Sequence, residues 1–471
     1  MNKYNSSCFA SLLLLVGGLF YINTATAAPG TLSQEPLQTS SSAPPNLLFH
    51  LDTSGSMRHI VPEYDSSSYS FTCDNATSII AAGTAVDLDF SGGNPRIDVG
   101  GTNYQHGNTN STRCFDNAEL YYATLHDNGG SGVDVLYTGH YLNWYFDTST
   151  DGTGNWTDND YKPGARTRME VAQTALKDLV GTLSNVRVGL TTFDGSSGAD
   201  LETAIDDLDA SHLSTMNSAI DGTSASGFTP LAESLRDIGR YFANNSSGQC
   251  GGSSSTNLTI HPGHDTLESD VACSTLLGSR ITTAGPTQYF CQKNFAVMLT
   301  DGQPTEDRTI NSNLQDYDQD CTDADIIAAG GYSDCTAGSP DYDKKDTVTY
   351  AGSDDSDYWD DVAQALYEID LRPDLDDNNG NEVENNVITY TIGFADESVR
   401  NHPLIQQTAD QGGGEFILAE NADDLRTAFE SATQSIIEQA SPSAAVTVNS
   451  RTLSSPSAGE RALFDTVRGC G

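Results

Sequence analysis

Residues 46–56 read Asn-Leu-Leu-Phe-His-Leu-Asp-Thr-Ser-Gly-Ser, a mostly apolar run that ends in a cluster of oxygen-bearing side chains. A short apolar run bounded by turn residues predicts a parallel strand buried on both faces. Residues 295–300, Phe-Ala-Val-Met-Leu-Thr, have the same character and end at Asp301-Gly302. Because helical patterns separate these and further apolar runs, the chain is expected to fold as a doubly wound, mostly parallel α/β sheet flanked by helices.

The expected elements form one series between residues 46 and 440. Strands are expected at 46–51, 186–193, 295–300, 386–394 and 415–418. Helices are expected at 168–183, 210–220, 230–242, 358–369 and 422–438. Long insertions rich in Gly, Ser, Asn, Asp and Tyr interrupt the series at 58–165, 244–292 and 303–356. Loops of this length tend to be functional, and their cysteines indicate that at least part of them is folded.

Oxygen-bearing side chains stand at three points of this series, each at a strand end or a helix start. They are Asp52, Ser54 and Ser56 after the first strand, Thr229 before a helix, and Asp301 after a later strand. The carboxyl ends of parallel strands face the ligand crevice of such sheets. Hard cations such as Mg²⁺ take oxygen ligands in near-octahedral geometry and keep some waters. The five residues therefore predict a divalent-cation site with an open position for a ligand carboxylate.

This set of five ligand types, in this chain order, resembles the von Willebrand factor A domain and its metal-ion-dependent adhesion site. The resemblance covers residues 46–440 and implies the α/β fold expected above. It implies that Ser54, Ser56 and Thr229 bind the cation directly. It implies that Asp52 and Asp301 act mostly through water. The implied cation is Mg²⁺, with Mn²⁺ or Ca²⁺ as alternatives. Asp301→Ala should then abolish cation binding while the cation-free protein unfolds much as before.

Composition limits the classes of partner. The 471 residues include 65 acidic and 22 basic side chains, for a formal net charge of −43. So acidic a surface repels nucleic acid and anionic membranes, which argues against both as direct partners. The chain has no G-x-S-x-G, H-E-x-x-H or phosphate-binding-loop sequence, so we expect it not to be an enzyme.

The first 27 residues are typical of a secretory signal peptide. Lys3 precedes the mostly apolar stretch Phe9–Ile22, and Ala25-Thr26-Ala27 provides a cleavage site of small residues. No later apolar run has the length of a membrane span. A Ser-, Pro- and Thr-rich leader over residues 28–45 follows. The mature protein is therefore expected to be exported, without a membrane span.

Export makes disulfides the expected state of the cysteines. Cys8 lies in the signal peptide, which leaves eight of the nine cysteines, and most of them fall within the insertions. Two pairs each share one insertion: Cys73 with Cys114, and Cys321 with Cys335. The remaining insertion holds an odd number: Cys250, Cys273 and Cys291.

A second acidic segment begins at Asp374 and reads Asp-Leu-Asp-Asp-Asn-Asn-Gly. It resembles a calcium loop in which Asp374, Asp376 and Asn378 would hold a structural Ca²⁺. The glycine and glutamate positions of an EF-hand loop are not matched, however. An acidic turn is therefore the preferred interpretation.

Local motifs narrow the resemblance to the PilY-type tip proteins of bacterial type IV pili. These motifs are Cys291–Phe295 leading into Leu299–Gly302, then Asp370–Asp374, then Tyr390–Phe394. The resemblance implies an exported protein of the periplasm, pilus tip or cell surface. It would support pilus biogenesis with minor pilins as partners, and bind a host or surface ligand carrying a carboxylate. The family's C-terminal propeller is not expected in this sequence, and residues 441–471 are expected to be a linker and the start of a truncated domain.

Two other functions stay open on the sequence. One is a stand-alone secreted A-domain protein that binds matrix through its cation and has no pilus role. The other is an intracellular partner of a chelatase-type motor, which the signal peptide opposes.

Overall fold

The computed structural model describes the strands and helices of the sheet-bearing region together with parts of the insertions. The described residues are 43–61, 78–80, 87–89, 96–99, 102–106, 112–123, 135–146, 164–246, 257–258, 271–272, 281, 283–307, 309–311, 314–315, 317, 356, 358–381, 383–400 and 402–440. The expected signal peptide, nearly all of the leader and the segment 441–471 lie outside them. So do five of the disulfide candidates: Cys73, Cys250, Cys273, Cys321 and Cys335.

A six-stranded sheet forms the centre, with the order β10-β9-β1-β13-β14-β15. Its strands are β1 (Asn46–Leu51), β9 (Arg187–Phe193), β10 (Ala199–Asp207), β13 (Asn294–Thr300), β14 (Val387–Phe394) and β15 (Gly413–Ala419). All neighbouring strands are parallel except β10, which runs antiparallel to β9 at one edge. Along the chain, β9 and β10 are added on one side of β1, and β13, β14 and β15 are then added on its other side. The order of the strands therefore reverses between β1 and β13, and such a switch point is where ligands bind in open α/β sheets.

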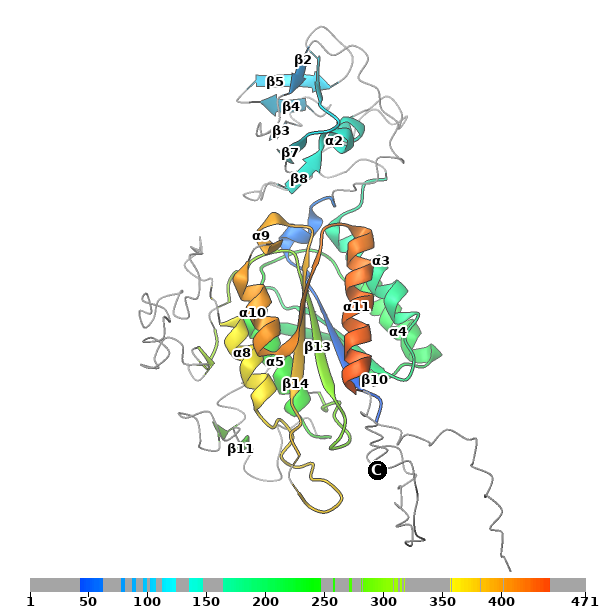
Figure 1. Cartoon of the computed structure of the whole chain (residues 1–471), viewed down its shortest axis with the longest axis vertical. Coiled ribbons are helices and arrows are strands. Elements are labelled where there is room, and N and C mark those ends of the chain that lie inside the picture. Colours follow the sequence, from blue (N-terminus) through cyan, green and yellow to red (C-terminus); the bar gives the residue numbers. More distant parts are fainter. Residues whose placement is uncertain are drawn as a thin grey trace, which may run out of the picture. The chain divides into compact units, whose positions relative to one another are not determined.

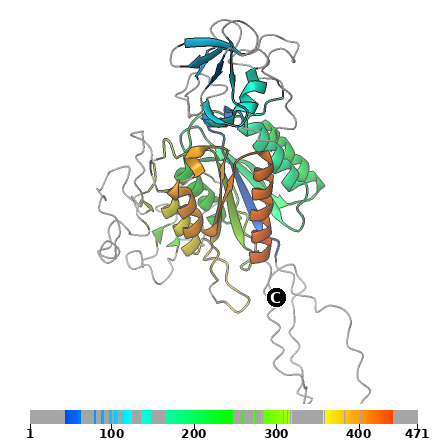
Figure 2. The same cartoon turned by 45° about the horizontal axis from the view of Figure 1, so that its top comes forward.

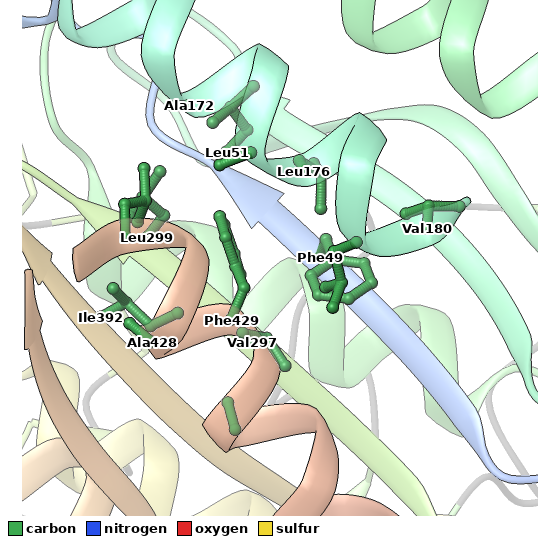
Figure 3. Close-up of a cluster of buried hydrophobic side chains, with 14 of the residues drawn as sticks. Phe49, Leu51, Ala172, Leu176, Val180, Val297, Leu299, Ile392, Ala428 and Phe429 are labelled. Atoms are coloured by element: carbon green, nitrogen blue, oxygen red, sulfur yellow. The ribbon is translucent and has the colours of Figure 1, made fainter. Parts of the chain in front are cut away.

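Helices cover both faces of this sheet (Figure 1). One face packs against α3 (Arg168–Val180), α4 (Ala210–Gly222) and α11 (Ala422–Ala440). The other packs against α5 (Leu231–Ala243), α8 (Trp359–Glu368) and α10 (Pro403–Gln411). Alternate residues of β1 and β13 point to opposite faces, so both strands are buried along their length. Figure 3 shows Phe49, Leu51, Val297 and Leu299 meeting side chains of α3 and α11.

The expected α/β fold is confirmed, and every expected helix and strand is present with ends shifted by a few residues at most. Outside the insertions, the described elements that were not anticipated are β10, α10 and the short helices η1 (Gly55–Arg58) and α9 (Glu397–Arg400). In addition, Ile310, Leu314 and Tyr317 lie within the segment expected to be the third insertion, yet they are buried in the core beside α5.

The first insertion contains its own secondary structure. Five short strands form one sheet: β2 (Ser78–Ile80), β3 (Asp87–Asp89), β4 (Arg96–Val99), β5 (Thr102–His106) and β6 (Thr112–Phe115). β7 (Leu120–Ala123) pairs with β8 (Val135–Thr138), and α2 (Gly139–Phe146) follows (Figure 2). Buried tyrosines form its small core. The second insertion holds the two-stranded pair β11 (Asn257–Leu258) and β12 (Val271–Ala272).

Candidate metal centre

Asp52 joins the carboxyl ends of β1 and β13. Its Oδ1 accepts a hydrogen bond of 2.7 Å from the backbone N–H of Ser54. Its Oδ2 accepts one of 2.9 Å from the Thr300 hydroxyl and one of 3.3 Å from the Asp301 N–H. Asp52, Thr300 and Asp301 are all fully buried. The turn after β1 and the end of β13 are therefore held together by the first of the predicted metal ligands.

Two serine hydroxyls approach Asp301. The hydroxyls of Ser54 and Ser56 lie 2.9 Å apart. The Ser56 hydroxyl donates to Asp301 Oδ1 at 2.7 Å, and Ser54 Oγ lies 3.4 Å from the same oxygen. Ser56 is the second residue of the short helix η1 (Gly55–Arg58), and it is only partly buried. Four of the five predicted ligands are thus joined by direct hydrogen bonds at the switch point of the sheet.

The fifth predicted ligand, Thr229, is connected to these residues through backbone contacts. Its N–H donates to the Thr305 hydroxyl at 2.9 Å, and its carbonyl accepts from the Thr305 N–H at 3.1 Å. The carbonyl of Gly227 accepts from the Gly55 N–H at 3.1 Å. Gly227 has a φ of 96°, a conformation that glycine adopts readily. The Thr229 loop is therefore fixed both to the turn after β1 and to the segment after β13.

A carboxylate from the segment after β13 caps the helix that Thr229 precedes. Pro230 stands at the N-cap position of α5 and offers no side-chain acceptor. Asp307 takes this role, because its two oxygens accept the N–H groups of Ala232 and Glu233 at 2.9 and 3.0 Å. Burial raises the pKa of Asp307 well above its usual value. Capping by a residue distant in sequence gives the Thr229 loop a second attachment to the chain after Asp301.

The site concentrates negative charge. Burial, followed by the nearby Asp301 carboxylate, raises the pKa of Asp52 to about 7. Two carboxylates in so dry a place cannot both ionise at low cost unless a cation or hydrogen bonds compensate them. Hard oxygen donors and an excess of negative charge fit a divalent cation of the Mg²⁺ type. Within the described ranges no group of three His, Cys, Asp or Glu side chains is placed to hold a metal.

Arg168, at the first position of α3, was not among the predicted site residues. Its side chain is fully buried, and its Nη1 donates to Asp301 Oδ2 at 2.8 Å. Its Nη2 donates to Asp396 Oδ2 and to the Ala395 carbonyl, both at 2.8 Å. Ala395 has a φ of 53°, which is uncommon for a residue other than glycine. No local sequence signal distinguishes Arg168, because its partners are 133 and 228 residues away.

The acidic segment proposed as a calcium loop is organised differently from the predicted ligand pattern. Arg372 donates to both oxygens of Asp374, at 2.7 and 3.0 Å. The turn that follows is held by Asp377, which accepts the N–H groups of Asn379 and Asn381. Calcium binding by Asp374, Asp376 and Asn378 stays a prediction, and the contacts favour the acidic-turn interpretation.

Two of the expected disulfide cysteines are described, Cys114 on β6 and Cys291 just before β13, and both are disulfide-bonded. The pairing of Cys73 with Cys114 and of Cys321 with Cys335 stays a prediction. Among the described helices, none is both long and apolar enough to cross a membrane.

Comparison with known proteins gives distant structural similarities only. No family model matches the chain, and no curated protein matches it. The PilB minor pilin from Streptococcus sanguinis is similar at 13% identity over 75% of this chain and 78% of that chain, with a TM-score of 0.31. The von Willebrand factor domain of the type V pili tip protein Mfa5 from Porphyromonas gingivalis is similar at 12% identity over 58% and 89%, with a TM-score of 0.29.

A von Willebrand factor type A protein from Catenulispora acidiphila is similar at 14% identity over 57% of this chain and 38% of that chain, with a TM-score of 0.29. Similarity at this level indicates no function for this chain.

Proposed function

We propose that this chain is an exported, non-enzymatic adhesion protein whose A-type domain binds a ligand through a divalent cation. The cation would be Mg²⁺ or Mn²⁺, or Ca²⁺ as the larger alternative. The observation that carries the proposal is the meeting of Asp52, Ser54, Ser56 and Asp301 within hydrogen-bonding distance at the switch point of the sheet. Hydroxyls and carboxylates from separate loops converge where open α/β sheets bind their ligands.

In this proposal each residue has a distinct task. Ser54, Ser56 and Thr229 offer neutral oxygens to the cation, and Asp301 and Asp52 supply the negative charge. Asp52 also fixes the Ser54 backbone and the end of β13. When bound, the cation supplies a positive centre with an open position that a ligand carboxylate can fill. Phe228, the residue before Thr229, keeps 47% of its surface exposed, and we propose it as an apolar contact for such a ligand.

The decisive test is calorimetric titration of Mg²⁺ into the EDTA-treated protein. Wild type should bind one equivalent, Asp52→Ala should bind none, and Ser54→Ala should bind more weakly because water can replace a neutral hydroxyl. Arg426→Ala, on the exposed side of α11, is a control that should bind like wild type. Equal Mg²⁺ affinity in wild type and Asp52→Ala would contradict the proposed site.

The biological setting is the finer part of the proposal. We propose the PilY-type role, at the pilus tip or cell surface, with minor pilins and a carboxylate-bearing host or surface ligand as partners. The alternative is a stand-alone secreted matrix-binding protein. Capture of minor pilins by the purified protein, abolished by EDTA and restored by Mg²⁺, would favour the pilus role. Cation-dependent binding to matrix without any pilin capture would favour the alternative.

A further inference from the structure

The contacts of Arg168 restrict how Asp301 can meet a cation. Oδ2 of Asp301 is engaged by Arg168 Nη1 at 2.8 Å. Only Oδ1 faces the hydroxyls of Ser54 and Ser56. Both side chains of the Arg168–Asp301 pair are fully buried, so water does not compete for this contact. Asp301 therefore offers one oxygen to the cation position and keeps the other for the guanidinium.

Asp52 is restricted in the same way. Its Oδ1 accepts the Ser54 N–H, and its Oδ2 accepts both the Thr300 hydroxyl and the Asp301 N–H. Neither carboxylate of the site is free to turn both oxygens toward a cation. Ca²⁺ takes six to eight oxygens, and its protein sites commonly include a carboxylate that binds through both oxygens. Mg²⁺ instead takes six ligands, keeps several waters and is held by one or two carboxylates.

Arg168 itself is held firmly. Its backbone N–H donates to the His59 carbonyl at 2.8 Å, beside the pairing of Ile60 with Thr167. Thr167 forms a capping box with Glu170 at the start of α3. At the other end, the guanidinium contacts Asp396 and the Ala395 carbonyl after β14. The residue is thus fixed at its backbone and at the two terminal nitrogens Nη1 and Nη2, and cannot easily release Asp301.

We propose that Arg168 is a positioning residue that keeps Asp301 a one-oxygen partner and thereby makes the site select small octahedral cations against Ca²⁺. The inference rests on the proposed function, because it concerns the same site. It goes beyond that function by assigning the metal preference to a residue that does not contact the cation.

The test compares the ratio of the Ca²⁺ and Mg²⁺ dissociation constants, measured by calorimetry, in wild type and Arg168→Met. Methionine fills a similar space but cannot engage Asp301, which becomes free to use both oxygens. We expect the ratio to shift toward Ca²⁺ by roughly tenfold or more, the effect of about 1.4 kcal/mol. Arg168→Lys retains a cation and should shift the ratio less. A merely structural role would lower thermal stability without changing this ratio.

Arg187→Met is the matched control. Arg187 is also a buried arginine of the sheet region, but it lies at the start of β9, where it donates to Asn46 and to the Pro286 carbonyl. The Arg187→Met variant should be less stable than wild type but should keep the wild-type ratio of the Ca²⁺ and Mg²⁺ dissociation constants. If Arg168→Met fails to fold, as judged by circular dichroism, the double variant with Asp396→Asn is measured instead, because it removes the charge of the second carboxylate that loses its contact with Arg168.

The outcomes separate the inference from the proposed function. Binding of Mg²⁺ by wild type with an unchanged ratio in the folded Arg168 variants would overturn the inference and leave the cation site standing. A shift of equal size in Arg187→Met would also overturn it, because the effect would then not be local. Failure of wild type to bind either cation would overturn both.

Discussion

Replacing Asp301 tests the ion pair and the cation site in one residue. In Asp301→Ala the cation site loses one of its two carboxylates, so Mg²⁺ binding should vanish. The cation-free protein should also be weakened, because Arg168 loses the partner of its Nη1 at 2.8 Å. The sequence alone favours unchanged stability, since a buried carboxylate is costly by itself. The buried Arg168 contact reverses that expectation.

The magnitude follows from the contacts that remain. A hydrogen bond to a charged group contributes about 1.5–3 kcal/mol. Arg168 keeps Asp396 and the Ala395 carbonyl, so the loss stays below the 3–5 kcal/mol, roughly, of a fully orphaned buried charge. Removing Asp301 also relieves its repulsion of Asp52, the second cause of the raised Asp52 pKa after burial. The net destabilisation should therefore be about 1–2 kcal/mol.

Asp301→Asn is the matched comparison. Its amide oxygen can still accept from Arg168, and its amide N–H₂ can donate to the serine hydroxyls, while the negative charge is gone. Its stability should lie within about 1 kcal/mol of wild type, yet it should fail to bind Mg²⁺. The assay is urea unfolding in EDTA, combined with calorimetric Mg²⁺ titration. An Asp301→Ala protein as stable as wild type would refute the role of the ion pair, and undiminished Mg²⁺ affinity in Asp301→Asn would remove Asp301 from the site.

Three further predictions concern protons, the α5 cap and the disulfides. Because the pKa of Asp52 is raised to about 7, its proton stabilises the cation-free fold at low pH, and this contribution is lost as the pH rises through 7. Mg²⁺ must displace that proton to bind, so the affinity of the protein for Mg²⁺ should fall by about tenfold per pH unit below 7 and level off above it. A Mg²⁺ affinity that does not change between about pH 5.5 and 8 would contradict this prediction. Asp307→Ala removes the cap of α5 and should lower the free energy of unfolding in urea by about 1–2 kcal/mol. It should also weaken Mg²⁺ binding, because the Thr229 loop is held less firmly. If neither the stability nor the Mg²⁺ affinity changes, the capping role is refuted. Mass mapping of non-reduced peptides should find Cys73 joined to Cys114, and a different partner for Cys114 would exclude that pairing.

The central strands could be predicted because local sequence determines them. β1, β13 and β14 are short apolar runs with every residue buried, and the polar residues that follow them mark the carboxyl edge of the sheet. The edge strand β10 was missed although Leu201, Thr203 and Ile205 alternate with Asp200, Glu202, Ala204 and Asp206. Its acidic outer face suits an edge that must not pair further, and it makes the segment polar overall, unlike the apolar runs that were expected to be strands.

The site could be predicted only in part, and the missing part has a physical cause. Metal-ligand types in the order Asp52, Ser54, Ser56, Thr229 and Asp301 can be recognised along a chain. The residues that hold them, such as Arg168 and Asp307, act through contacts that exist only after folding. In sequence, Arg168 is one cationic residue at a helix start and Asp307 one carboxylate among many.

Backbone strain and charge compensation together indicate that the proposed cation site would be formed before any cation binds. Glu306, between the Thr229 partner Thr305 and the capping Asp307, has a φ of 54°, and Ala395 has a φ of 53°. Each such conformation costs on the order of 1 kcal/mol and persists only where the surroundings fix it. Here hydrogen bonds fix both residues. Those of Thr305 and Asp307 surround Glu306, while the Ala395 carbonyl accepts from Arg168 and the Ala395 N–H donates to the Ala419 carbonyl. Because Arg168 already compensates part of the negative charge, the loops need not collapse onto a cation to fold. Cation binding should then change the charge of the site more than its shape.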